Sequence, residues 1–68
     1  MSKYSRVKFL LEQGAFSVVE ITNKLYIADP RSSIRVLRSM GVPVGDYWVH
    51  LENGIRFKKY FIRYGTKD

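Results

Sequence analysis

The sequence predicts a small α+β domain in which three helices precede a β-hairpin. Short amphipathic segments with start or stop signals of their own occupy residues 2–41. Two runs rich in aromatic and β-branched residues follow, joined by the dipeptide Asn53-Gly54. With 68 residues the chain has room for one domain, and we expect a single domain over 1–68 with an ordered core of about 3–64. The ends, Met1–Lys3 and Gly65–Asp68, are predicted to be loose.

Composition indicates a folded, basic protein that is held together by packing. Hydrophobic residues make up 46% of the chain and aromatics 15%, too much for intrinsic disorder. With no cysteine and a single histidine, His50, we expect no disulfide, no metal site and no cofactor. Twelve Lys and Arg against six Asp and Glu give a net charge of +6, which attracts nucleic acid first and anionic membrane second.

No apolar run approaches the roughly 18 residues of a membrane span, and the N-terminus lacks the apolar region of a signal peptide. We therefore expect a cytoplasmic, nucleoid-associated protein without a membrane partner.

The first helix is predicted to begin at Ser2 or Ser5 and to end near Gln13, with Gly14 as its stop. Its apolar face is formed by Tyr4, Val7, Leu10 and Leu11, whereas Phe9 either packs under a later strand or is half exposed. Ala15 and Phe16 are too few for an independent strand, but they suffice for a brief pairing with the returning hairpin.

The second helix is predicted to begin at a capping box and to end near Leu25. In the box, Ser17-Val18-Val19-Glu20, each polar side chain satisfies an N–H group of the helix start. The inward face comprises Val18, Ile21, Thr22 and Leu25. The connection Tyr26-Ile27-Ala28 has no glycine, and we expect Ile27 to fill the space between this helix and the next.

The third helix is predicted over Asp29–Gly41, with Asp29 as N-cap, Pro30 at the first helical position and Gly41 just beyond the end. At about 100° per residue one side carries Arg31, Arg35 and Arg38, and the opposite side carries Val36, Leu37 and Met40, with Ile34 at the edge. No Asp, Glu or Lys interrupts this helix, so no intrahelical ion pair neutralises the arginines. The alternative is an ordinary solvated face.

The hairpin is predicted from two strands, Tyr47–Leu51 and Arg56–Ile62, after an extended Val42–Val44 and a turn at Gly45-Asp46. Alternation puts Arg56, Lys58, Tyr60 and Ile62 on one face and Ile55, Phe57, Lys59 and Phe61 on the other. Neither face is purely apolar, so we expect a bulge near Lys58-Lys59. Trp48 and Tyr60 are predicted to pack in the core or the hairpin, and His50 to have no special chemistry.

Helices followed by one hairpin are the order of a winged helix-turn-helix, and the sequence resembles a family of that kind. The resemblance rests on Leu10-Leu11-Glu12-Gln13-Gly14, on Ser17–Glu20, on Ile34–Val44, on Asp46–Val49, and on Asn53-Gly54 with Arg56–Tyr60. These segments are similar to small winged helix-turn-helix domains of bacteriophages and mobile elements, over roughly residues 5 to 62. The resemblance implies DNA binding in regulation, excision or packaging. At the positions of Ser32 and Ser33 the family often has small apolar residues, so these serines face either the core or the DNA.

On this interpretation the third helix enters the DNA major groove, and the hairpin lies on the flanking backbone. The predicted DNA-binding residues are Arg31, Ser32, Arg35, Arg38, Ser39, Arg56, Lys58 and Lys59. The hairpin cations have an alternative role, because charges protect an edge strand from aggregation.

The predicted partner is double-stranded DNA, with a homodimer or a protein partner to supply further specificity. We expect neither enzyme activity nor a small-molecule substrate, because Glu12, Glu20 and Asp29 have roles at helix termini and no catalytic set remains. The rival interpretations are a protein-interaction module on the same scaffold and an RNA or single-strand binder, in which exposed aromatic residues would have to form a stacking surface.

Overall fold

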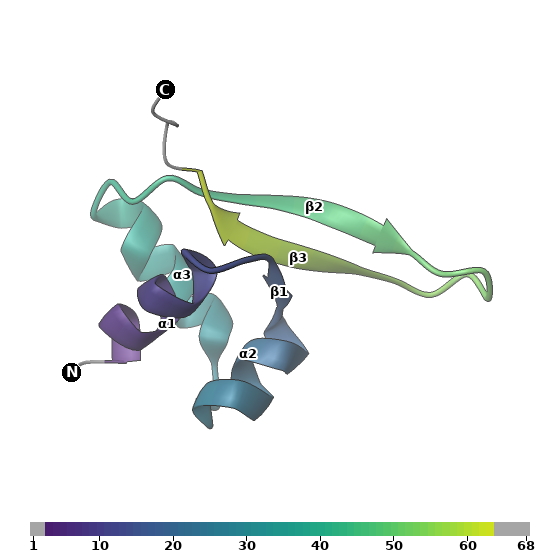
Figure 1. The fold of residues 1–68 in the computed structure, drawn as a ribbon, viewed down its shortest axis with the longest axis horizontal. Helices are drawn as coiled ribbons and strands as arrows, with labels where there is room; N and C mark the ends of the chain where they lie inside the picture. The colour runs from purple at the N-terminus through teal and green to yellow at the C-terminus, as the bar shows by residue number, and fades with distance from the viewer. Residues whose placement is uncertain (1–2, 64–68) are drawn as a thin grey trace.

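The computed structural model describes residues 3–63 and confirms the predicted fold class, three helices followed by an antiparallel β-hairpin. The elements in chain order are α1 (Lys3–Leu11), β1 (Phe16–Ser17), α2 (Val18–Leu25), α3 (Pro30–Ser39), β2 (Val44–His50) and β3 (Arg56–Ile62). In Figure 1 the helices gather on one side, and the hairpin of β2 and β3 extends well beyond them, in a winged-helix-like arrangement. The ends predicted to be loose lie outside the described residues, except for Lys3, which begins α1.

The start of α2 is the capping box that the sequence predicts. The Glu20 N–H donates to Ser17 Oγ over 3.1 Å, and the Ser17 N–H donates to Glu20 Oε1 over 2.8 Å. Without a glycine, the chain leaves α2 through Tyr26, which takes the left-handed conformation (φ 56°) while its N–H donates to the Thr22 carbonyl. Because an L side chain is strained there, the turn keeps its shape at a cost in backbone energy.

The start of α3 differs from the prediction at one residue. Pro30 occupies the first turn as expected, but the Asp29 side chain makes no capping hydrogen bond within residues 3–63. Pro30 lacks an N–H and fixes its own backbone, so the helix start is defined by the proline ring. At the other end Gly41 has φ of 89°, the left-handed conformation that the predicted stop required.

The core lies where the three helices meet the base of the hairpin. Its buried apolar side chains are Val7, Leu11, Ile21, Ile27, Ile34, Leu37, Val44 and Tyr60. Ile27 is buried between the helices as predicted, and Tyr60 takes the predicted core position, whereas Phe9 is 59% exposed and so adopts the exposed alternative. No helix in the described part of the chain is long and apolar enough to cross a membrane.

The buried face of α3 is rotated from the predicted one. Its buried residues are Pro30, Ser33, Ile34 and Leu37, spaced at i, i+3, i+4 and i+7, so Ile34 lies at the centre of the face and not at its edge. Met40 is 64% exposed because it follows Ser39, the last helical residue, and the chain turns away there. Ser33 is fully buried, so of the two serines left open this one faces the core.

The sheet has the strand order β1-β3-β2, and every neighbouring pair is antiparallel. Phe16 and Ser17 pair with Tyr60 and Lys59, as expected of a brief strand. The β2–β3 ladder pairs residue for residue from Val44↔Ile62 to His50↔Arg56, so the predicted bulge at Lys58-Lys59 is wrong. The mixed polarity has another cause: only the base of the hairpin packs on the helices, and the rest projects into solvent (Figure 1).

The predicted turn at Gly45-Asp46 is also wrong, because both residues lie within β2. Gly45 pairs with Phe61, and a Cβ at this position would lie 2.8 Å from Phe61 Cζ and 2.6 Å from Arg63 Cδ. Glycine is therefore required by the ring packed across the strand, which has the same sequence signature as a turn. The ring of Tyr47 completes this outer face, 5.9 Å from the Phe61 ring.

Candidate nucleic-acid interface

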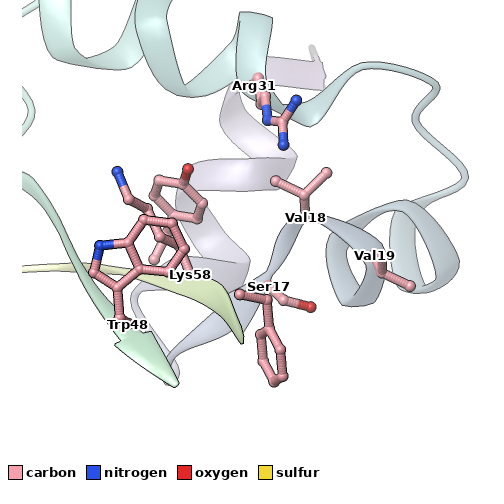
Figure 2. Close-up of a pocket in the computed structure, with 8 residues that line it drawn as sticks. Ser17, Val18, Val19, Arg31, Trp48 and Lys58 are labelled. Atoms are coloured by element: carbon pink, nitrogen blue, oxygen red, sulfur yellow. The ribbon is translucent and has the colours of Figure 1, made fainter. Parts of the chain in front are cut away.

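The arginine stripe of α3 faces the hairpin across a concave surface. A shallow hollow of about 240 Å³ is lined by Arg31, Ile34, Arg35, Arg38 and Tyr60. A larger hollow of about 600 Å³ lies between the hairpin and the starts of α2 and α3 (Figure 2). Arg31 and Tyr60 line both hollows, so the two form one continuous surface, which we call the basic groove.

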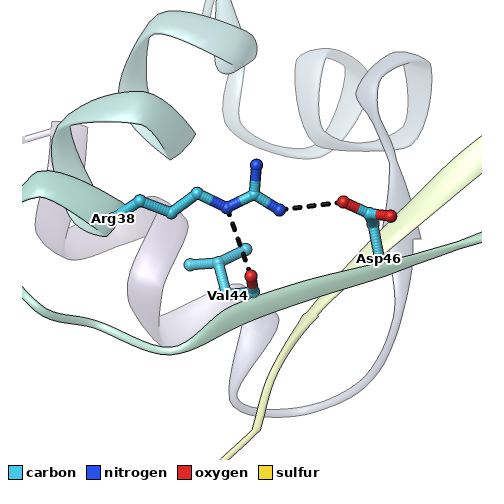
Figure 3. Close-up of polar contacts among 3 residues, drawn as sticks. All are labelled: Arg38, Val44 and Asp46. Carbon is cyan, nitrogen blue, oxygen red and sulfur yellow. Dashed lines mark hydrogen bonds and ion pairs between the residues drawn. The ribbon is translucent and has the colours of Figure 1, made fainter.

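Arg31 and Arg35 are exposed on α3, whereas Arg38 is engaged with the base of the hairpin. Arg38 Nε donates to the Val44 carbonyl over 3.2 Å, and its Nη2 pairs with Asp46 Oδ2 at 2.9 Å (Figure 3). Its guanidinium also lies 5.9 Å from the centre of the Tyr60 ring. Arg38 thus fixes the angle between α3 and the hairpin, and 44% of its side chain still faces solvent.

The hairpin cations divide between two faces. In the ladder Trp48 pairs with Lys58, so both side chains and that of Arg56 lie on the face shared with Tyr60. The Arg56 guanidinium lies 5.0 Å and the Lys58 ammonium 5.1 Å from the centre of the Trp48 ring, within the range of cation–π attraction. Lys59 lies on the other face, where its Nζ is 3.6 Å from Glu20 Oε1. The structure therefore brings Arg56 and Lys58 toward the basic groove and separates Lys59 from them.

The three serines of α3 have different surroundings. Ser32 is half-buried beside the stripe, and Ser33 is in the core, where its Oγ has no hydrogen-bond partner among residues 3–63. Ser39 is exposed and donates its hydroxyl proton to the Val36 carbonyl over 2.7 Å. Its oxygen remains able to accept a hydrogen bond but its proton is already used.

The acids near the basic groove are paired. Within the described residues, no Asp or Glu lines either hollow. Asp46 is paired with Arg38, and Glu20 accepts from the Ser17 N–H and lies near Lys59. The Ser17 N–H and the Lys59 ammonium hold the pKa of the Glu20 carboxyl below its usual range, against the opposing effect of burial. The groove is therefore cationic without neutralising carboxylates on its walls.

Sequence reasoning missed the exposure of Trp48, which was expected to pack in the core or the hairpin. The ring does contact cations of the hairpin, but it is 50% exposed and lines the larger hollow. Counting outward from Asn53-Gly54 would pair Trp48 with Lys58 and put both beyond the helical body. The strand register was therefore the available signal.

No group of three His, Asp or Glu side chains in residues 3–63 is arranged to hold a metal ion. Comparisons of the chain with models of protein families, with curated proteins and with solved structures find no match.

Proposed function

We propose that this protein binds double-stranded DNA, with α3 in the major groove and the hairpin along the neighbouring backbone. The observation that carries the proposal is the basic groove: exposed arginines of α3 and the hairpin cations Arg56 and Lys58 border one concave surface whose walls carry no acid within residues 3–63. The fold alone does not carry it, because a winged-helix-like arrangement serves several functions.

The dimensions and chemistry suit a duplex. The ten residues of α3 span about 15 Å, which fits a B-DNA major groove of about 12 Å width. Arg31 and Arg35 are the exposed arginines at its N-terminal end, where such helices reach base edges, and a guanidinium donates bidentately to guanine. Arg56 and Lys58 then serve phosphates, which set affinity more than sequence preference.

A duplex titration at about 50 and about 200 mM salt tests the proposal. We expect affinity to fall steeply with salt, and the double variant Arg31→Ala, Arg35→Ala to reduce the slope of log K against log salt by about two. Both side chains are exposed, so circular dichroism should show an unchanged fold.

The matched control is Lys8→Ala on α1, whose ammonium is paired with Glu12. It removes one positive charge away from the basic groove. Equal salt slopes for wild type and the arginine double variant, with both folded, would contradict the proposal.

The finer role extends the same proposal. The resemblance to domains of bacteriophages and mobile elements supports a regulator or accessory factor that acts in regulation, excision or packaging, on the nucleoid and with a second copy or a protein partner for specificity.

One observation favours a protein-interaction module instead, namely the exposed apolar side chains of the hairpin, Tyr47, Leu51 and Ile55. No binding to any duplex at low salt, despite the charge of +6, would favour that alternative.

A further inference from the structure

The larger hollow contains an aromatic wall that the duplex contact does not need. Trp48 is 50% exposed there, although Tyr60, on the same face of the hairpin, is only 9% exposed. Across from Trp48, Val18 and Val19 begin α2, and Val19 is 66% exposed (Figure 2). The hollow therefore presents apolar surface on two sides, with a volume of about 600 Å³ that falls in the range of ligand sites.

Cations border this apolar surface. Lys58 and Arg56 approach the Trp48 ring from β3, and Arg31 lines the hollow from the start of α3. The carboxylate of the neighbouring α2, Glu20, is turned away from the hollow to the Ser17 N–H and Lys59. A ligand that fits must therefore offer a flat or apolar group together with negative charge.

We propose that the larger hollow binds an unpaired nucleotide, whose base stacks on Trp48 and whose phosphate lies between Arg31 and Lys58. Every base has a π-face that stacks on an aromatic side chain, and the phosphate meets the two cations without displacing an acid. A base inside an intact duplex is already stacked on its neighbours and cannot enter. The site uses neither Arg35 nor the major groove, so it goes beyond the proposed duplex contact.

Trp48 is the only tryptophan of the chain, so its fluorescence reports on the site directly. The unmodified protein is titrated at low salt with oligo(dT), an abasic oligomer of equal length, polyglutamate, a blunt duplex and thymidine monophosphate. We expect saturable quenching of Trp48 by oligo(dT), and weaker binding without this quenching by the two polyanions that lack bases. Thymidine monophosphate separates the sources: quenching by it assigns the site to free nucleotides as well, and quenching by oligo(dT) alone assigns it to a strand.

Two variants locate the effect, with binding followed by anisotropy of a labelled oligomer. Trp48→Leu should weaken oligo(dT) binding about tenfold, the effect of losing one stacked base. The matched control, Tyr47→Leu, removes a similarly exposed ring from the opposite face of the hairpin and should leave affinity unchanged. Circular dichroism verifies that both variants fold.

Three results would overturn this inference: no oligo(dT) binding at low salt, equal binding and quenching by the abasic oligomer or polyglutamate, or equal losses in the two variants. The duplex proposal fails separately, because Arg35→Ala is expected to weaken duplex binding without affecting oligo(dT), and Trp48→Leu the reverse.

Discussion

Replacing Ser33 by alanine should stabilise the protein, although the residue lies on the helix proposed to contact DNA. Ser33 is fully buried on the core face of α3, and its Oγ has no hydrogen-bond partner among residues 3–63. A buried hydroxyl without a partner costs about 1–3 kcal/mol of folding free energy. Alanine also favours a helix over serine by about 0.5 kcal/mol.

The opposing effect is the void left by one oxygen atom, which is smaller than a methyl group and costs less than about 1 kcal/mol. The net gain in the free energy of unfolding is therefore about 1–2 kcal/mol for Ser33→Ala. For a domain of this size each kcal/mol raises Tm by about 4–8 °C.

Thermal and urea unfolding followed by circular dichroism measure this gain. The matched control is Ser32→Ala, a half-buried neighbour on the same helix, for which we expect a change within about 0.5 kcal/mol. Duplex affinity of Ser33→Ala should equal that of wild type, because the side chain faces the core. A loss of stability in Ser33→Ala would refute the reasoning, since it would mean that the hydroxyl is satisfied in the folded protein.

Three further changes test the contacts around the basic groove. Asp46→Asn should change stability by less than about 1 kcal/mol and raise duplex affinity, because it removes a half-exposed carboxylate that pairs with a groove arginine; weaker duplex binding would contradict this. Donation from the Ser17 N–H lowers the pKa of Glu20, so its stabilising contribution is present above its ordinary value of 4.5 and is lost as pH falls through the folded-state pKa; Glu20→Gln should therefore flatten the acid limb of the stability curve. Gly45→Ala should cost about 1–3 kcal/mol in unfolding experiments, because its Cβ would meet a ring atom at 2.8 Å, whereas Gly14→Ala, with its nearest atom at 3.6 Å, should not.

Much of the fold was predictable because its signals are local. A capping box, a proline at a helix start and an Asn-Gly dipeptide act over a few residues, so α2, α3 and the hairpin were placed correctly. The errors arose where a distant residue decides the outcome. Gly45 resembles a turn glycine in sequence, but it is there to accommodate Phe61 from the partner strand. Met40 continues the helical period, but the chain leaves the helix one residue earlier.

The candidate site divides in the same way. The arginine stripe, the net charge and the identity of the hairpin cations are properties of the sequence alone, because helical and strand periods determine which residues share a face. The tertiary structure decided which faces meet: it brought Arg56 and Lys58 to Trp48, paired Lys59 with Glu20 and tied Arg38 to the hairpin. Those outcomes depend on the angle at which the hairpin leaves the helices, and that angle is set by packing between residues far apart in the chain, which no local period encodes.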